Sequence, residues 1–263
     1  MQVKRIVFTT LLSSMFVSSL HATAAERELI IAGIPEQPLR YQDKNGKPGG
    51  LDYKIVDTVF ARLGVKTKVV FENSSTRLDK SWQDGSFDVI YCYSKNKERE
   101  QFLWYPNESH ITIRWKYWTS PELFAKRQIN TLDDMKGLKV GATVGYSYSK
   151  DFWAKGKAGV YTLDEVVKNE AQAPKLLAKR IDVMVDHPFR VLFEAKENNY
   201  MDKIKEHPGV VKEAPYYTTF VKKSNYPGLE GLVKKYDETL KKMKEDGTIA
   251  KIYAEYNMEY SNK

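Results

Sequence analysis

The 263-residue chain has little of several residue types that define whole classes of protein. Its single cysteine, Cys92, excludes an intrachain disulfide framework and any multi-thiolate zinc or iron–sulfur site. Four histidines leave little for a histidine-rich metal centre. With only 15 glycines and 10 prolines beside 42% hydrophobic residues, the chain is neither collagen-like nor disordered. We therefore expect a packed globular protein that holds no metal and no cofactor.

Long apolar runs are also missing, except at the start of the chain. Lys4 and Arg5 precede an acid-free apolar run at 6–20, which ends at the small-x-small pattern Ala22–Ala24. This order predicts a secretory signal peptide over residues 1–24. A transmembrane anchor is the alternative, but it needs about 20 apolar residues, and serines and threonines interrupt this shorter run. Because no cysteine stands at the cleavage site, we expect a periplasmic protein that is not lipid-anchored.

The charge of the chain has no dominant block. Removal of the leader with Lys4 and Arg5 lowers the formal net charge from +8 to +6 over 263 − 24 = 239 residues. The remaining basic residues are dispersed, and acids interrupt even the lysine-rich run at 241–246. Dispersed charge is typical of a solvated surface, so nucleic acid is not expected as a partner. A basic exported protein also suits work near an anionic membrane face or the capture of solutes.

The first part of the mature chain alternates strand and helix signals. Short apolar runs between turn residues are typical of buried strands, and apolar residues three or four apart predict helices. In chain order we expect a strand at 29–32, a hairpin turn at 43–50, a helix at 55–63, a strand at 65–71, a helix at 76–82 and a strand at 87–92. This βαβαβ order predicts a parallel sheet with crossover helices.

A second block, over residues 115–215, repeats this alternation. We expect a short helix at 131–137, a strand at 138–143, a helix at 149–154, a helix at 162–179 begun by a Thr162/Glu165 capping box, a strand at 181–185 and a helix at 189–198. The block is therefore a second α/β unit.

The end of the chain has helices without strands of their own. Residues 214–222 are expected to be extended, and helices follow at 229–243 and 249–256. Such helices need an existing layer to pack on, and the first unit is the natural host. The first unit then becomes discontinuous, and the chain crosses between the units twice.

Several short segments carry a resemblance to a known family. They are Pro38 and Tyr41, then 43–52, 62–64, 82–88, 97–99 with 105–106, 132–141 and 243–253. In this order the chain resembles the extracellular solute-binding proteins of the amino-acid type, which feed ABC transporters. That family includes the glutamine-binding and the lysine, arginine and ornithine-binding proteins. The resemblance covers essentially the whole mature chain.

The resemblance implies an α/β protein with the two-lobe, type II fold of periplasmic binding proteins. Lobe 1 would comprise residues 25–111 and 218–263, and lobe 2 residues 112–217. The hinge would be formed by crossing segments near 111–115 and 213–219. A small ligand would bind between the lobes, which close over it. The implied partners are an amino acid or a related amine or carboxylate and the membrane permease of an ABC transporter, with the binding protein a monomer.

Two charged residues match ligand-binding positions of the family. Arg99 matches the arginine that clamps the ligand carboxylate; a solvated arginine in the charged run 95–100 is the competing interpretation. Asp186 matches the aspartate that accepts from the ligand amine. It follows the strand at 181–185, and ligands bind at the carboxyl ends of strands in open α/β sheets. A helix N-cap before Pro188 is its compatible structural role.

The resemblance also implies a carboxylate-binding loop in the second lobe. Residues 145–149 join a strand to a helix, so their N–H groups favour an anion at the helix N-terminus. Within this loop Tyr146 and Ser147 replace the usual threonine and glycine, and Thr143 ends the strand before it. In the first lobe, Ser94 fits the hydroxyl position near the carboxylate, and Tyr93 fits the preceding backbone contact.

Two positions depart from the family pattern. The aromatic residues over the ligand of the glutamine-binding protein align with Glu36 and Ser75. Glu36 is either a solvated loop carboxylate or a partner for a cationic group, which would favour a basic amino acid or amine. The aromatic residues near the first crossing, Trp115, Tyr117 and Trp118, either replace the lost stacking or belong to the core.

Three function classes remain open on the sequence. A non-catalytic binding protein is our expectation. An enzyme on the same fold, similar to cyclohexadienyl dehydratase, would need an acid or base such as Glu36, Asp186 or His187. The chain carries no HExxH, P-loop or GxGxxG motif, and Cys92 in an apolar strand is more typical of a packed thiol. A sensory module that presents a ligand to a receptor would share every one of these features.

Overall fold

The computed structural model describes residues 27–260. The predicted signal peptide at 1–24 lies outside the described residues. The strands are β1 Leu29–Gly33, β2 Tyr41–Gln42, β3 Pro48–Gly49, β4 Thr67–Phe71, β5 Val89–Ser94, β6 Leu103–Trp104, β7 Ile111–Thr119, β8 Lys139–Thr143, β9 Thr162–Val166, β10 Val183–Asp186 and β11 Lys205–Val221. The α-helices are α1 Leu51–Arg62, α2 Ser75–Asp84, α3 Arg99–Phe102, α4 Pro121–Lys126, α5 Lys150–Lys157, α6 Gln172–Leu177, α7 Pro188–Glu197, α8 Leu229–Glu245 and α9 Thr248–Glu255. Short 3₁₀ helices cover Leu132–Met135, Asn169–Ala171 and Met201–Lys203.

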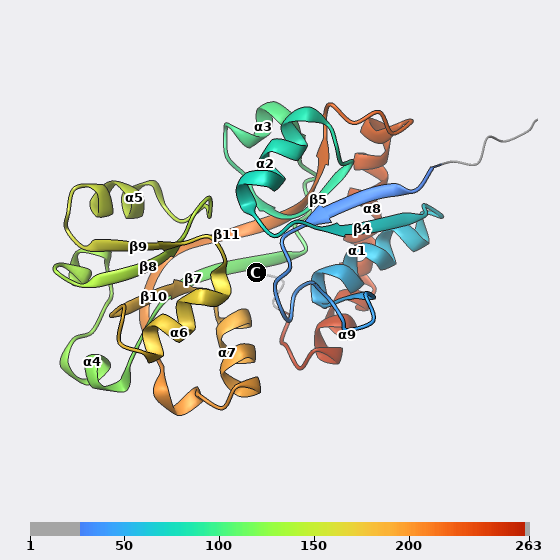
Figure 1. Ribbon diagram of the computed structural model, residues 1–263. Helices are drawn as coiled ribbons and strands as arrows, with labels where there is room; N and C mark the ends of the chain where they lie inside the picture. The colour runs from blue at the N-terminus through green and yellow to red at the C-terminus, as the bar shows by residue number, and fades with distance from the viewer. Residues whose placement is uncertain (1–26, 261–263) are drawn as a thin grey trace, which may run out of the picture.

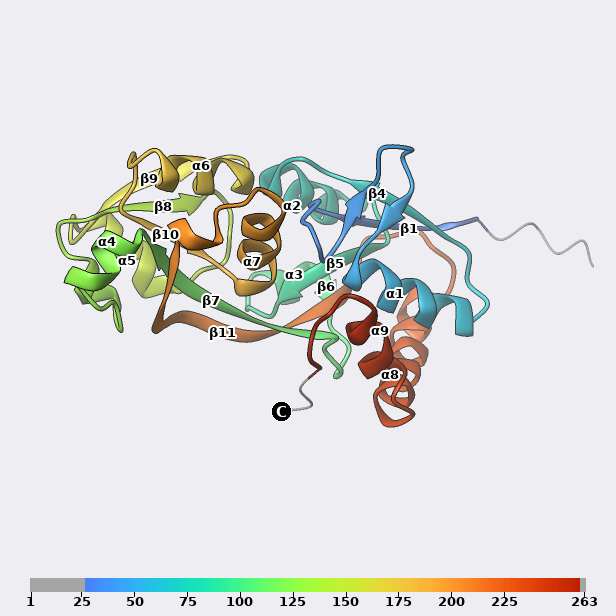
Figure 2. The ribbon, with the colours of Figure 1, turned by 90° about the horizontal axis from the view of Figure 1, so that it is seen from below.

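The elements form two lobes that are joined by two long strands (Figure 1). Lobe 1 contains β1–β6, α1–α3, α8 and α9, so it is built from both ends of the described chain. Lobe 2 contains β8–β10 and α4–α7. Figure 2 shows β7 and β11 running side by side from one lobe into the other. The two-lobe architecture predicted from the sequence is confirmed.

One sheet passes through both lobes in the order β4-β1-β5-β11-β7-β10-β8-β9. In lobe 1, β1 pairs in parallel with β4 and β5, as the βαβαβ pattern predicted. In lobe 2, β8 pairs in parallel with β9 and β10. The crossing strands are antiparallel to their neighbours: β11 pairs with β5 and β7, and β7 pairs with β10. Because β7 and β11 belong to both parts of the sheet, bending these strands changes the angle between the lobes.

Lobe 1 has hydrophobic layers on both faces of its sheet. On β1, Leu29 and Ile31 join the cluster that contains α1, α8 and α9, whereas Ala32 joins the cluster beneath α2. The alternation continues on β5, where Tyr91 joins the first cluster and Ile90 the second. A parallel sheet covered by helices on both faces needs apolar residues at successive positions, which explains the continuous apolar runs in the sequence.

Lobe 2 is built in the same way. On β10, Val183 and Val185 pack with the α5 side, and Met184 packs with α6 and α7. Trp118 of β7 lies in the same cluster as Met184, and Tyr117 is buried in the larger core. Of the aromatic residues near the first crossing, Tyr117 and Trp118 therefore belong to the core.

The helix predicted at 162–179 is wrong at its start. Residues Thr162–Val166 form β9, which pairs along its whole length with β8 at Lys139–Thr143. A free sheet edge in the fold outweighed the local capping pattern, and β-branched Thr162 and Val166 suit a strand. The helix begins only at Gln172, as α6.

The other predicted elements have counterparts in the structure. The short helix predicted at 131–137 is the 3₁₀ turn Leu132–Met135, with a capping box between Thr131 and Asp134. The predicted extended segment at 214–222 is the last part of the much longer β11. The predicted lobe boundaries at 111/112 and 217/218 fall at the start of β7 and inside β11, and they stay a prediction.

Candidate functional site

A cavity lies where the two lobes meet the crossing strands. Lobe 2 contributes Gly145, Tyr146, Ser147 and His187, and the crossing strands contribute Ile113, Trp115 and Tyr216. Lobe 1 contributes the remaining wall, from β1, α2, β5 and the loops beside them. The cavity has a volume of about 60 Å³. In this conformation the site suits a solute of few non-hydrogen atoms.

The structure brings most of the predicted site residues to this cavity. Its lining includes Glu36, Tyr93, Arg99, Tyr146 and Ser147. Three predicted residues are not among the lining residues: Ser94, which accepts from Arg99, and Asp186 and Thr143, which are buried in lobe 2. Trp115, which the sequence left between stacking and core, lines the cavity and is buried.

Arg99 lines the cavity and, unlike Arg40, has no ion-pair partner within residues 27–260. It begins α3, its side chain is buried, and its guanidinium carbon lies 4.0 Å from the centre of the Tyr93 ring. One nitrogen, Nη1, donates to the carbonyl and hydroxyl oxygens of Ser94 at 3.2 and 3.4 Å. Within residues 27–260 no carboxylate lies at ion-pair distance from Arg99. A buried guanidinium without a counter-ion favours an anionic ligand.

A second cation, Lys212 of β11, stands beside Arg99. Its Nζ donates to Ser94 Oγ at 3.0 Å, to Ser147 O at 2.7 Å and to Ser147 Oγ at 3.1 Å. Burial and the nearby Arg99 lower the pKa of Lys212 to about 8. Since Ser94 is in lobe 1 and Ser147 in lobe 2, this lysine joins the two lobes close to Arg99.

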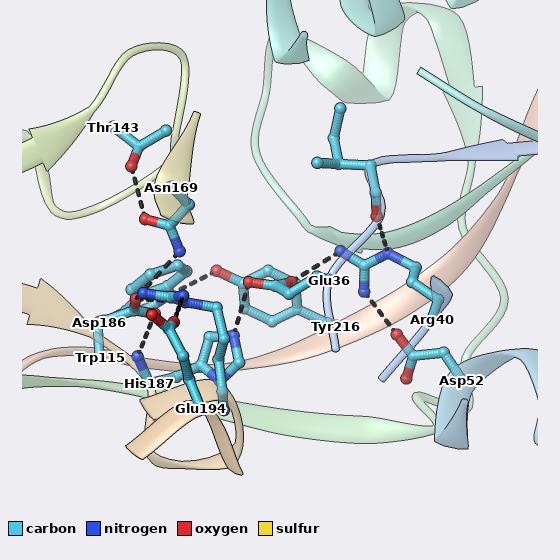
Figure 3. A network of polar contacts seen from close by, with 12 residues as sticks. Glu36, Arg40, Asp52, Trp115, Thr143, Asn169, Asp186, His187, Glu194 and Tyr216 are labelled. Carbon is cyan, nitrogen blue, oxygen red and sulfur yellow. Dashed lines mark hydrogen bonds and ion pairs between the residues drawn. The ribbon is translucent and has the colours of Figure 1, made fainter. Parts of the chain in front are cut away.

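Glu36 is occupied by partners from the protein itself (Figure 3). Its carboxylate accepts from Arg40 Nη2 at 2.9 Å and lies 2.9 Å from His187 Nε2. His187 Nδ1 accepts the backbone N–H of Arg190, so Nε2 carries the proton that Glu36 accepts. Burial alone would raise the pKa of Glu36, but His187 and the arginines outweigh it and lower the pKa to about 2. The carboxylate is therefore charged and already neutralised.

Arg40 extends this network into lobe 1. It donates to Asp52 at 2.7 Å and, through Nε, to the Ile34 carbonyl at 2.7 Å. Asp52 is fully buried and also lies 3.1 Å from His110. Burial acts to raise the pKa of Asp52, yet His110 and Arg40 lower it. Every charge along this line has an opposite charge beside it.

Asp186 ends β10 and is likewise neutralised from within lobe 2 (Figure 3). It forms an ion pair with Arg190, one turn into α7, and accepts from Asn169 Nδ2 at 3.0 Å. Asn169 in turn accepts from Thr143 Oγ1 at 2.6 Å. The sequence predicted Asp186 as the N-cap of α7, but the N-cap is the next residue, His187. We call Glu36, Arg40, Asp52, Asp186, His187 and Arg190 the paired cluster.

Polar contacts also join the lobes around the cavity. Ser75 Oγ donates to the Val144 carbonyl at 2.8 Å, and Ser94 Oγ lies 3.5 Å from Ser147 Oγ. Gly145, which follows Val144, has a φ of +77°, and a Cβ there would lie 2.4 Å from Ser75 Oγ. Glycine at 145 therefore allows the loop of lobe 2 to approach α2 closely, and the described conformation is a closed one.

Tyr146 fills part of the space that a shorter loop residue would leave open. Its ring lies 5.6 Å from Trp115 and 6.2 Å from Tyr148. Burial, with Glu36 nearby, raises the pKa of Tyr146 well above its ordinary range. The neutral phenol of Tyr146 thus lines the cavity from the lobe 2 side.

Two clusters have the donor types of a metal site. They are Asp52 with Cys92 and His110, and Glu36 with Asp186 and His187, each with donor atoms within 4.8 Å of one another. In both clusters, however, the carboxylates are already bound by arginine. A metal ion would have to lie beside these guanidinium groups, so the charge arrangement does not favour one.

Cys92 has an unusual backbone but an unreactive environment. Its φ is +57°, at the point where the pairing of β5 with β11 is irregular, and its side chain is buried. Burial raises the pKa of its thiol well above the ordinary value. A buried neutral thiol is a poor nucleophile, which agrees with the interpretation of Cys92 as a packed residue.

Sequence reasoning missed three charged residues of the site. Arg40 and Lys212 lie in segments without a periodic pattern that assigns their side chains to an interior. Asp79 is half-buried and lines the cavity from α2, whose buried residues, Leu78 and Trp82, do follow helical spacing. That spacing places Asp79 beside the buried stripe, and this is the only signal that could have singled it out.

The comparisons with known proteins agree with this architecture. Residues 29–259 match the bacterial extracellular solute-binding proteins, family 3. A curated relative, the probable amino-acid ABC transporter-binding protein of Haemophilus influenzae, is 22% identical over 232 residues, covering 83% of this chain and 80% of that protein.

Two solved structures share the fold. One is an ABC uptake transporter substrate-binding protein from Streptococcus pneumoniae with bound histidine, with a TM-score of 0.75 and 20% identity, covering 90% of this chain and 95% of that one. The other is a histidine kinase sensor domain similar to periplasmic binding proteins, with a TM-score of 0.75 and 17% identity, covering 89% of this chain and 99% of that one. Since the family match spans nearly the whole described chain, the protein belongs to the bacterial extracellular solute-binding proteins of family 3.

Proposed function

We propose that the protein captures a small amino acid or a related carboxylate in the interlobe cavity and delivers it to the membrane permease of an ABC transporter. The observation that carries this proposal is Arg99. It is buried, it lines the cavity, and no carboxylate within residues 27–260 neutralises it. A ligand carboxylate would supply the missing charge.

The surroundings of Arg99 strengthen an interaction with a carboxylate. Lys212 adds a second positive charge, and Ser94 and Ser147 add hydroxyl groups at the same end of the cavity. Charge-assisted hydrogen bonds in a site that excludes water are stronger than those on the surface. The loop at 145–149 also leads into α5, whose N-terminus favours an anion.

The relatives support the choice of an amino acid and a transporter, since a curated one is named an amino-acid ABC transporter-binding protein. Membership of an extracellular family and the predicted leader at 1–24 support a periplasmic location. Within residues 27–260 no helix is long and apolar enough to cross a bilayer. We expect the protein to act as a monomer.

We further propose that binding occurs without turnover. The acids and the histidine that an enzyme would need are those of the paired cluster, where Glu36 and Asp186 are held by arginines. A group held in this way is poorly placed to exchange protons with a substrate. A cyclohexadienyl dehydratase-like enzyme would instead convert its substrate in multiple turnovers.

The first experiment is a thermal-shift screen of the purified protein against the twenty standard amino acids. We expect at least one to raise the melting temperature by mass action. Native mass spectrometry of the untreated protein then identifies any solute that survives purification. Recovery of the added compound unaltered supports binding, whereas conversion of many equivalents would place the protein among enzymes. A screen in which no amino acid raises the melting temperature contradicts the proposal.

A second experiment separates transport from sensing. The radiolabelled amino acid identified by the screen is offered to cells with and without the gene. Loss of uptake in the deletion strain supports delivery to a permease, and unchanged uptake supports a sensory role.

A further inference from the structure

We propose that Asp79 of α2 accepts the ammonium group of the bound amino acid. This inference rests on the proposed function, since it concerns the same cavity. It assigns a role to a residue outside the set matched by resemblance, and it removes that role from Asp186. The ligand class that follows is an α-amino acid, whose carboxylate and ammonium groups are separated by a single carbon.

The first step is that Glu36 and Asp186, the two carboxylates that the sequence suggested for a cationic group, are already paired with arginines. Glu36 accepts from Arg40 at 2.9 Å and from His187 at the same distance. Asp186 is fully buried, bonded to Arg190 and Asn169, and not part of the cavity wall. An ammonium group that reached either one would meet a carboxylate whose charge an arginine of the protein already balances. Coulomb repulsion from Arg40 or Arg190 would oppose it.

The second step is the environment of Asp79. It lines the cavity, and within residues 27–260 no lysine, arginine or histidine lies at ion-pair distance from it. Its Oδ1 accepts from Tyr93 Oη at 2.7 Å and from Trp82 Nε1 at 3.0 Å. Both donors are neutral, so they orient the carboxylate without cancelling its charge. Because both bonds end on Oδ1, Oδ2 stays available for a ligand.

The third step is that Tyr93 holds both charges of the site. The Arg99 guanidinium lies over its ring at 4.0 Å, and Asp79 accepts from its hydroxyl. A positive and a negative group are thus placed on one rigid aromatic side chain, both beside the cavity. An α-amino acid presents the complementary pair of charges, a carboxylate for Arg99 and an ammonium group for Asp79. The Glu36 interpretation from the sequence favoured a basic side chain, whereas Asp79 requires only the α-ammonium group that all α-amino acids share.

The test uses pairs of probes that differ only in the ammonium group. They are L-alanine with propionate, L-glutamate with glutarate, and L-arginine with 5-guanidinopentanoate. Calorimetry with the wild-type protein is expected to show at least one amino acid binding about tenfold or more tightly than its deaminated partner. In Asp79→Asn, which keeps an oxygen for Tyr93 and Trp82, the two should bind within about threefold of each other.

Three further variants sharpen the test. Asp79→Glu retains the charge and should retain a preference for the amino acid. Asp84→Asn makes the same substitution at the exposed end of the same helix, and Asp186→Asn makes it in the paired cluster. Both variants should still bind the amino acid about tenfold more tightly than its deaminated partner. A melting curve of each ligand-free variant checks that it folds.

The possible results distinguish failure of the role of Asp79 from failure of the proposed function. Suppose that the wild type binds a probe amino acid more tightly than its deaminated partner. If Asp79→Asn keeps this full preference, or if Asp186→Asn abolishes it, Asp79 does not accept the ammonium group. The proposed carboxylate site at Arg99 would then still stand. Equal binding of both members of every pair by the wild type likewise overturns the role of Asp79. If the wild type binds none of the probes and no standard amino acid in the screen, the proposed function itself fails.

Discussion

Two groups of charged side chains lie within reach of the interlobe cavity, and they differ in how their charges are balanced. In the paired cluster, each carboxylate has an arginine beside it, as Glu36 has Arg40 and Asp186 has Arg190. In the second group, Asp79, Arg99 and Lys212 have no counter-ion within residues 27–260. We call these three the open cluster.

The difference indicates what each group does. Burying a charge is unfavourable unless an opposite charge or hydrogen bonds compensate it. The paired cluster meets this condition within the protein, so it contributes to the conformation of each lobe and to their contact. In the open cluster no ion pair within residues 27–260 supplies this compensation, which is why we propose it as the ligand site. Residue type and burial alone do not separate the two groups, because Arg40 and Arg99 are equally buried arginines at one cavity.

The largest expected effect comes from breaking the paired cluster. Arg40→Met would leave Glu36 and Asp52 buried without their arginine, which costs about 3–5 kcal/mol of free energy of unfolding. Urea denaturation measures this loss. Arg62→Met, which removes an exposed pair with Asp246, is the matched control and should cost less than about 1 kcal/mol. A loss at Arg40 as small as that of the control would mean that the cluster contributes little to stability.

Breaking the open cluster should affect binding and not folding. Arg99→Met is expected to weaken binding of the amino acid found in the screen by about 2–5 kcal/mol, at least tens of fold. The ligand-free melting temperature should stay near that of the wild type, because no carboxylate loses its partner. Calorimetric titration measures the affinity, with Arg77→Met on the exposed face of α2 as the control. Binding within about threefold of wild type would place the carboxylate clamp elsewhere.

A smaller effect is expected from pH, through Lys212. Its pKa is lowered to about 8, so the ammonium form predominates below pH 8 and is lost above it. A bound carboxylate favours that charged form, so affinity should fall as pH rises from 7 to 9, by up to about tenfold. Calorimetry at each pH measures this change. In Lys212→Arg, which stays protonated, the profile should be flat; an equal decline in this variant would show that another group titrates.

The smallest effect is expected at Arg114 of β7, an arginine near the first crossing. It forms a bidentate pair with Glu213, and both side chains are about half exposed, at 55% and 45%. Arg114→Ala should change the free energy of unfolding by less than about 1 kcal/mol and leave amino-acid affinity unchanged. The same titrations and urea curves apply. A large loss of affinity would instead place Arg114 in the ligand site.

Much of the fold could be predicted from the sequence. Buried parallel strands need consecutive apolar residues, and their helices need apolar spacing with terminal glycines, so 29–32, 55–63 and 87–92 were assigned correctly. The prediction failed at 162–166, where Thr162 and Glu165 fit a helix cap locally. The edge of β8 decided that segment, and its pairing partner lies more than twenty residues away in the chain.

The site was predictable only in part, for a related reason. Arg99 could be identified by resemblance and is brought to the cavity wall, as are Tyr146 and Ser147. Asp186 was equally well marked, but Arg190 occupies it. Nothing in the sequence at 186–190 distinguishes an aspartate free to meet a ligand from one bonded to the next turn of its helix.

The sequence by itself determined the two α/β units, because apolar periodicity and turn residues act locally along the chain, and its resemblance to a known family indicated the class of protein. Only the tertiary structure decided which charges are neutralised. Glu36 and His187 are 151 positions apart and meet across the lobes, and Lys212 and Ser94 are 118 apart. Whether a buried charge is satisfied depends on every neighbour within a few ångströms, and those neighbours are set by how the two lobes and crossing strands come together.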